Sequence, residues 1–310
     1  MPAAYLHEQL ALGARTAAAT AYPAVASLPT APLLTGAQGP DPFFFYKMLS
    51  LFRANRAAVE SVGTLLHERR TNAFLLALLR HGMRSGPDSL AYALGFVTHY
   101  AADSTAHPFV YAHSFDAAGA YQSNLHCGLE AALDTWLYRE QGHPQGVPLQ
   151  MAGMAALTEP QRGAVTTALR VALGQVFPEH PVDEPAIRHC LADSVRTCRL
   201  LYSPRGIKYR LLCALGALLG QRGLVEAHAL PLRLPQNDFL NLAHAAWCSP
   251  FEPGWARDES FSDIFAQAQA RAANLLTAAW LFTQGEMEEE ALAALLGNLH
   301  YDSGTALRDC

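Results

Sequence analysis

The sequence has few charged residues and no long apolar run of the kind that spans a membrane. Only 16% of its 310 residues are Asp, Glu, Lys or Arg, below the usual share of about 25%. The net charge of −5 counts against long nucleic acids as partners. The uncharged stretch 16–40 contains four prolines, and its apolar residues are mostly alanine. We therefore expect no transmembrane segment.

Closely spaced cysteine pairs are also missing. None of the six cysteines belongs to a C-x-x-C motif, which counts against a thiolate zinc finger and a thioredoxin-like motif. The first residues carry no basic segment, and Arg15 interrupts the apolar run that follows. This pattern is not typical of a signal peptide, so we expect a reduced, cytoplasmic protein.

The residue pattern predicts an all-α fold, a single multi-helix bundle. Alanine and leucine dominate, while alternating Val, Ile and Thr runs are nearly absent. Thr158 and Gln161 have the spacing of a capping box, which predicts a helix start. The Pro-rich stretches 28–42 and 229–257 are expected to be irregular. The expected helices cover 4–22, 43–61, 65–83, 89–110, 121–140, 184–202, 207–220, 259–283 and 286–298.

The expected helix 89–110 is apolar on nearly all sides, yet it carries three ionisable residues four positions apart. His99, Asp103 and His107 therefore project from one helix face. Their Cα atoms span about 12 Å along the axis, so one metal ion cannot bind all three. Two ions could, with Asp103 between them, because a carboxylate can bridge metals about 3.5–4 Å apart.

The next helix repeats this spacing with His126, Glu130 and Asp134. Asp134 is expected to orient a ligand histidine rather than to bind metal itself. Burying carboxylates without neutralisation is costly, and imidazole together with carboxylate suits zinc. The total of 13 histidines agrees with metal chemistry. Either triple alone would more often be a satisfied core histidine or a surface ion pair, so the prediction depends on their occurring together.

The motifs in the first half resemble the bacterial zinc-dependent phospholipase C family, which shares an all-α superfamily with single-strand-specific nucleases. The motifs are His7, Gly39-Pro40-Asp41-Pro42, His67, His99-Tyr100-Ala101-Ala102-Asp103, His107-Pro108 and His126-x-x-x-Glu130. The resemblance implies a helical bundle that holds two or three zinc ions in an interhelical cleft. It covers about 1–140, expected to form the metal-binding core, with 141–310 adding further helices to the same domain.

The resemblance also implies a set of metal ligands. His99 and Asp103 match a ligand pair in which the aspartate bridges two metals, and His67 matches a histidine that joins the first zinc. His126 and Glu130 match the pair of a second zinc site. Its third ligand is His107 or, because the spacing departs from that of exported members, His113.

Two further ligands follow from the same resemblance. Asp41 matches an aspartate that is both ligand and general base, and His7 matches the histidine of a third zinc. In exported members the N-terminal residue completes that third site. Here Pro2 would offer an amine and a carbonyl if Met1 were removed, and the third site would be weak or absent if Met1 stayed.

Two residues near these motifs are candidates for substrate binding. Tyr46, after a run of three phenylalanines, could contact a cationic head group through its ring, although plain core packing is the simpler interpretation. Arg69 could bind a phosphate, and a solvated surface arginine is an equal alternative.

The reaction implied is hydrolysis of a phosphate ester by a metal-bound water, as in a phospholipase C or another phosphodiesterase. The substrate would be a small-molecule or lipid phosphoester. The alternative is a catalytically inactive or metal-free helical interaction protein. The sequence does not determine the oligomeric state.

Overall fold

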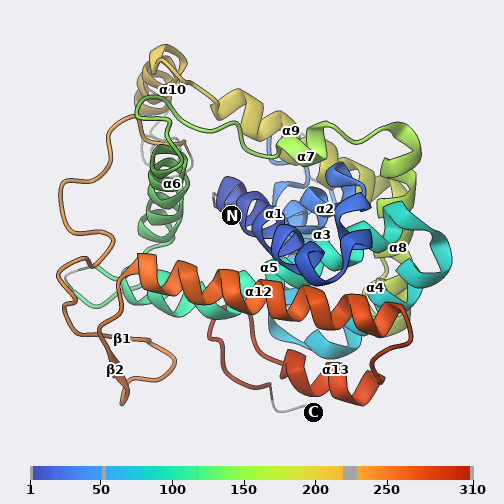
Figure 1. Cartoon of the computed structure of the whole chain (residues 1–310). Helices are drawn as coiled ribbons and strands as arrows, with labels where there is room; N and C mark the ends of the chain where they lie inside the picture. The colour runs from blue at the N-terminus through green and yellow to red at the C-terminus, as the bar shows by residue number, and fades with distance from the viewer. Residues whose placement is uncertain (1–2, 51–53, 117, 219–228, 308–310) are drawn as a thin grey trace. The chain divides into compact units, whose positions relative to one another are not determined.

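A computed structural model of the chain describes residues 3–50, 54–116, 118–218 and 229–307. These residues form an all-α fold, as predicted, with one two-stranded antiparallel sheet in which Trp247 pairs with Arg257 (Figure 1). The helical elements are α1 Ala4–Ala21, η1 Pro23–Ser27, α2 Thr30–Gly36, η2 Asp41–Phe45, α3 Arg56–Glu68, α4 Thr71–Ser85, α5 Pro87–Ala112, α6 Ser123–Glu140, α7 Ala152–Ala155, α8 Glu159–Val176, α9 Glu184–Leu201, α10 Ile207–Leu218, α12 Phe261–Thr283 and α13 Glu289–Leu296. The strands are β1 Trp247–Cys248 and β2 Ala256–Arg257.

The chain divides into two compact units, each assembled from segments distant in sequence. Unit 1 comprises Met1–Leu6, Ala106–Gln150 and Cys198–Phe265. Unit 2 comprises His7–Thr105, Met151–Thr197 and Ala266–Cys310. Both units draw on residues from either side of position 140, and the expected arrangement of one domain stays a prediction.

Unit 2 contains a close crossing of α2 and α5 that depends on two glycines. A Cβ atom at Gly95 would lie 2.0 Å from the carbonyl oxygen of Leu33, and one at Gly36 would lie 2.1 Å from that of Tyr92. Real carbon atoms do not approach oxygen so closely, so only glycine fits at either position. The crossing brings the chain that follows α2 against the middle of α5.

The core of unit 1 is built from large apolar side chains on several of its segments. Its buried residues are Ala3, Leu6, Phe109, Val110, Leu133, Leu137, Leu240, Trp247, Phe261 and Ile264. The rings of Phe109 and Trp247 meet edge to face, with centroids 5.4 Å apart. Leu133 and Leu137 of α6 belong to this core and lie on the same side of the helix as His126 and Glu130, two turns further along it.

Two of the expected segment boundaries were wrong. Stretch 28–42 contains helix α2, because Pro29 and Pro32 fall at its cap and in its first turn, where no intrahelical N–H is needed. The expected helix 43–61 is instead the short helix η2 and, beginning at Arg56, helix α3. The residues 51–53 between them lie outside the described residues.

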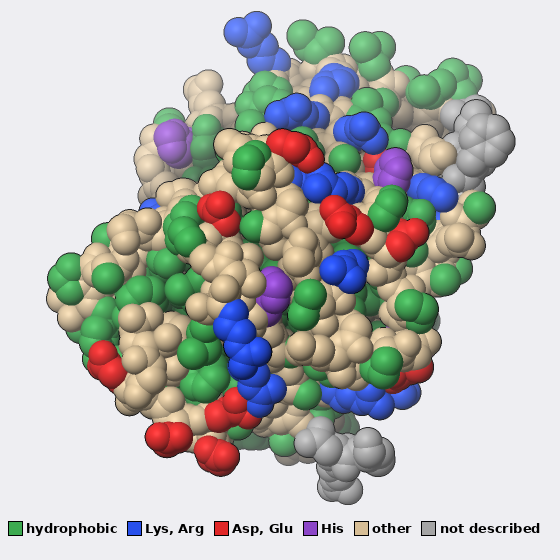
Figure 2. Space-filling view, turned by 90° about the vertical axis from the view of Figure 1, so that its right-hand side faces the viewer, with side chains coloured by type: hydrophobic (Ala, Val, Ile, Leu, Met, Phe, Trp, Pro, Cys, Tyr) green, Lys and Arg blue, Asp and Glu red, His purple; other side chains and the backbone are tan. Residues whose placement is uncertain are grey.

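The helix starting after Thr158 is confirmed, with both hydrogen bonds of the capping box. Within the described ranges, no helix is both long and apolar enough to cross a bilayer. The face drawn in Figure 2 intersperses acidic and basic side chains among apolar and uncharged ones.

Candidate metal centres

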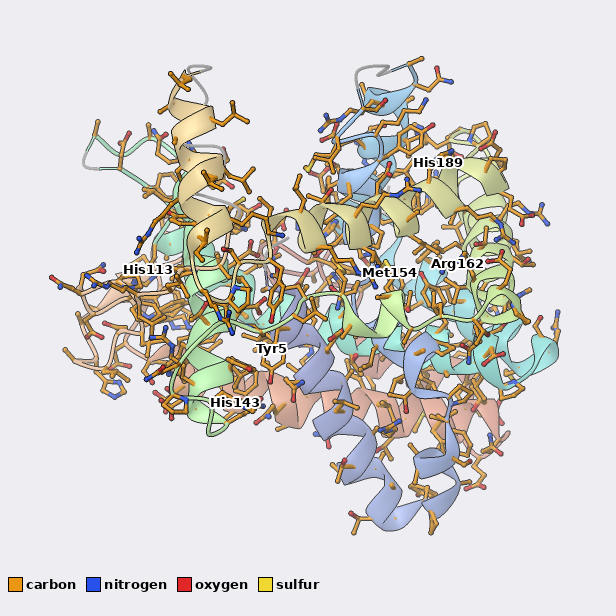
Figure 3. The ribbon with its side chains drawn as sticks, turned by 90° about the horizontal axis from the view of Figure 1, so that it is seen from above. Tyr5, His113, His143, Met154, Arg162 and His189 are labelled. Atoms are coloured by element: carbon orange, nitrogen blue, oxygen red, sulfur yellow. The ribbon has the colours of Figure 1, made fainter. Side chains whose placement is uncertain are left out.

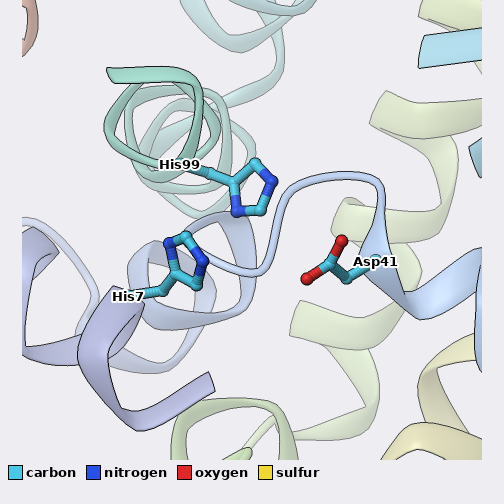
Figure 4. A group of neighbouring side chains, drawn as sticks. All are labelled: His7, Asp41 and His99. Carbon is cyan, nitrogen blue, oxygen red and sulfur yellow. The ribbon is translucent and has the colours of Figure 1, made fainter. Parts of the chain in front are cut away.

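One group of buried donor atoms in unit 2 combines three separate segments. His7 comes from α1, Asp41 from η2 and His99 from α5, and their side chains point toward one another (Figure 4). One donor atom from each lies within 4.8 Å of the other two. Asp41 and His7 are at most 5% exposed, and His99 is fully buried. The three segments therefore create a polar group inside the core.

Asp103 lies at the centre of this part of unit 2. Its Oδ1 lies 3.3 Å from His7 Nε2, and its Oδ2 lies 2.9 Å from His99 Nε2. The same Oδ2 lies 3.7 Å from the Nε2 of His67, which also lies 3.5 Å from Asp41 Oδ1. Two ligand atoms of one zinc ion are at most about 4.2 Å apart when each bond is about 2.1 Å long. These spacings fit shared metal ligands.

Main-chain carbonyls orient two of the imidazoles. His99 Nδ1 lies 3.1 Å from the Ala37 carbonyl oxygen, and His67 Nδ1 lies 2.7 Å from that of Gly63. Because a carbonyl only accepts hydrogen bonds, each Nδ1 must carry the proton. In the neutral rings, both Nε2 lone pairs then face the carboxylate of Asp103. Such an arrangement requires a proton or a metal cation between the groups.

The pKa values of two histidines show how strongly this environment acts. Burial, reinforced by the neighbouring His99, lowers the pKa of His7 to about 4. Burial also acts against the charged form of His67, but hydrogen bonds with Asp103 and Asp41 raise its pKa to about 10. A positive charge on His67 is therefore favoured beside the two carboxylates.

A second group of donor atoms lies in unit 1. His107, at the end of α5, and His126, on α6, place their Nε2 atoms 3.5 and 3.4 Å from Glu130 Oε1. All three side chains are buried, and their donor atoms lie within 4.8 Å of one another. His126 and Glu130 are one helical turn apart, so α6 alone sets their spacing.

Buried nitrogen atoms test whether these groups suit a metal. His99 Nε2 has no hydrogen-bond partner among the residues that the structure describes, although Asp103 Oδ2 lies only 2.9 Å from it. A buried polar atom without a partner costs free energy. A donor set of imidazole and carboxylate also matches the known preference of zinc. The residues present fit zinc in both groups.

His113 is not one of the residues in the second group. Figure 3 labels His113 among the side chains of the structure. Its Nδ1 lies 2.8 Å from the Phe109 carbonyl oxygen, and its ring packs against those of Phe109 and Trp247. Of the two alternatives raised by the spacing, His107 is the residue that lies beside His126 and Glu130. Pro2, proposed for the third site, lies outside the described residues.

The two predicted substrate-binding residues lie in different surroundings. Tyr46 is buried, its ring meets that of His189 edge to face, and it lines a groove of about 700 Å³ together with Val59 and Arg170. Arg69 is exposed at the end of α3. Their roles stay predictions.

Asp134 has other hydrogen-bond partners than the ligand histidine expected for it. Its carboxylate does not orient a ligand histidine through any hydrogen bond in the described residues. It accepts hydrogen bonds from the main-chain N–H groups of Tyr5 and Leu6, at 3.1 and 2.8 Å, and from Gln150 Nε2 at 2.8 Å. Asp134 thereby anchors the start of α1, directly before His7.

Sequence reasoning missed two residues beside the first group. Gly39, with φ of +51°, lies against the ring of His99, where a Cβ atom would be 2.1 Å from Cδ2. Tyr301 is buried with its ring centroid 5.2 Å from that of His67, and its N–H donates to the His67 carbonyl oxygen. The Gly39-Pro40-Asp41-Pro42 motif gave a signal for the first, and nothing in the sequence marked the second.

The helical fold and the imidazole–carboxylate groups define a class of all-α protein with zinc-compatible centres. The family model described as zinc dependent phospholipase C matches residues 7–177. The chain therefore belongs to the zinc-dependent phospholipase C family. Comparison with curated proteins and with solved structures gave no match.

Proposed function

We propose that this chain is a zinc-dependent hydrolase of lipid phosphoesters, in which both donor groups hold zinc. His7, Asp41, His67, His99 and Asp103 would be the ligands in unit 2, with Asp103 shared between ions. His107, His126 and Glu130 would be the ligands in unit 1. The observation that carries the proposal is that His67 and His99, fixed by main-chain carbonyls, direct their Nε2 atoms at one carboxylate.

Bound zinc would supply a Lewis acid for the phosphate oxygens and lower the pKa of water. Asp41 would act as general base, since its carboxylate is buried beside the donor atoms of the first group. His67 Nε2 lies 3.5 Å from Asp41 Oδ1, a spacing that suits two ligands of one zinc ion. No covalent intermediate with the chain is needed.

A lipid substrate is favoured by the family and by the aromatic residues that adjoin the second group. The ring of Tyr111 lies 4.8 Å from that of His126, and it contacts the rings of Tyr121 and Phe251 at 5.5 and 5.1 Å. Tyr121 and Phe251 are more than 40% exposed. Apolar rings open to solvent beside a metal-compatible group suit a substrate with an apolar part.

The test combines metal analysis with hydrolysis. The full chain, purified without chelator, is expected to contain two or three zinc ions and to release diacylglycerol from phosphatidylcholine micelles. Asp41→Asn is expected to lower the rate by about 100-fold or more. The control Asp88→Asn, in the first turn of α5, is expected to leave the rate unchanged.

Each outcome has a distinct meaning. Zinc without hydrolysis of any phosphodiester would overturn the enzymatic proposal and leave the metals a structural role. A folded chain without metal would overturn the zinc sites as well, and would favour a helical interaction protein.

A further inference from the structure

The exposed apolar side chains of the described residues are concentrated in unit 1. Of the fifteen large apolar side chains exposed there, twelve belong to unit 1. Four of them are between 53 and 84% exposed and lie on a single helix, α10, at Ile207, Leu211, Leu215 and Leu218. Isolated exposed leucines are ordinary, but a row of four on one helix requires an explanation.

The spacing of these four residues produces a continuous apolar stripe. At about 100° per residue they fall within roughly 80° of arc, and the exposed Ala214 lies beside them. The opposite side of α10 contains Leu212, Cys213 and Gly216, which are partly or fully covered. The stripe is therefore the outer face of a helix whose inner face packs on the protein.

Positive charge surrounds this stripe. The described residues 198–218, all in unit 1, include four basic residues and no acidic one, in a chain whose net charge is −5. Arg210 and Lys208 lie on the two sides of the stripe, and Arg205 is exposed just before the helix. The Lys208 ammonium donates to the Arg199 carbonyl oxygen, at 2.8 Å.

We propose that α10 docks unit 1 onto an anionic lipid surface. A basic helix with an apolar outer face is the pattern that lies in the plane of a membrane interface, with its apolar side chains among the acyl chains and its basic side chains at the head groups. With 12 residues, α10 is about 18 Å long, far short of the roughly 30 Å hydrocarbon core, so it lies on the bilayer.

This inference deepens the proposed function, because hydrolysis of a lipid requires the enzyme to reach a lipid surface. Its test does not depend on hydrolysis. Co-sedimentation of the full chain is measured with vesicles of phosphatidylcholine alone and with vesicles of phosphatidylcholine and phosphatidylglycerol in equal amounts. We expect strong binding to the anionic vesicles, weakened by salt, and little binding to the neutral ones.

Variants of the exposed face identify the docking element. Leu211→Gln is expected to weaken vesicle binding about tenfold, because a side chain that would enter the acyl region becomes polar. Arg210→Gln is expected to weaken binding to anionic vesicles about fivefold and to leave neutral vesicles unaffected. Leu242→Gln is the matched control, because Leu242 is 60% exposed in the same unit but lies outside α10. This variant is expected to bind vesicles as well as the wild type does.

Three results would overturn the inference. The first is that the wild type fails to bind anionic vesicles. The second is that Leu211→Gln binds these vesicles as well as the wild type and the control Leu242→Gln do. Alternatively, ultracentrifugation shows a dimer that Leu211→Gln dissociates, in which case a second copy covers α10.

A hydrolysis assay separates this inference from the proposed function. If both hold, Leu211→Gln keeps the wild-type rate on a water-soluble short-chain phosphatidylcholine and loses rate on anionic vesicles. Vesicle binding without hydrolysis of either substrate would overturn the proposed function and leave the docking inference standing.

Discussion

Substituting Gly39 tests whether the main chain after α2 determines the position of His99. A Cβ atom at this residue would lie 2.1 Å from His99 Cδ2 and 2.4 Å from Cγ. Because carbon atoms in contact are about 3.5 Å apart or more, the ring would have to move by roughly 1.4 Å. Zinc ligands tolerate displacements of only about 0.2 Å. Gly39→Ala is therefore expected to lose zinc from the first group.

The loss of stability in Gly39→Ala has two parts, backbone strain and crowding of the His99 ring. A control variant with the same backbone strain but no crowding separates them. Alanine at a positive φ costs about 1–2 kcal/mol, and crowding a buried ring adds about 1–3 kcal/mol. Gly285 also has a positive φ, of +74°, but nothing lies within 4 Å of its Cβ position. We expect Gly285→Ala to lower the free energy of unfolding by about 1–2 kcal/mol and Gly39→Ala by about 2–5 kcal/mol.

The assay is urea unfolding of both variants in EDTA, so that metal binding does not contribute, followed by zinc analysis of the untreated proteins. Gly285→Ala is expected to retain its zinc. The reasoning is refuted if Gly39→Ala keeps wild-type zinc, or if both variants lose the same stability.

Three further predictions concern the ligands and their surroundings. Asp103→Asn is expected to lower both the affinity for zinc and the rate of hydrolysis more than 100-fold, because an amide cannot bridge two cations. Normal zinc content with full turnover would contradict the assignment of Asp103 as a shared ligand. Glu130→Gln is expected to remove one zinc ion per chain while the unit 2 group stays loaded, and metal analysis showing complete loss would contradict two separate groups. Asp134→Ala leaves the N–H groups of Tyr5 and Leu6 without their acceptor, so urea unfolding should show a loss of about 2–4 kcal/mol, with a smaller loss for Asp134→Asn; equal stability of all three proteins would show that the contact is dispensable.

The parts of the site that lie on one helix could be predicted from the sequence. Residues four apart share a helix face, so His99 with Asp103, and His126 with Glu130, follow from the helical period alone. The structure places both pairs as that spacing requires. The all-α fold was predictable for the same reason, because periodicity and composition are local properties.

The contacts between distant segments could not be predicted in this way. Asp134 continues the four-residue spacing of α6, yet its partners are main-chain N–H groups near position 5, which leave no pattern in the sequence. Tyr301 lies beside His67 although more than half of the chain separates them. The helix α2 was missed because prolines usually mark loops, and only the structure shows that these prolines occupy its first positions.

The glycine crossing of α2 and α5 has a consequence for redesigning the metal preference. Gly36 and Gly95 fix the separation of the two backbones without any side chain, so the frame that carries His99 does not depend on the chemistry of the ligands. Ligand side chains on these two backbones can therefore be exchanged, for example His99 for a cysteine, while the spacing of α2 and α5 stays constant. Enlarging either glycine would instead separate α2 from α5, and would shift His99 and Asp103 relative to Asp41, which follows α2.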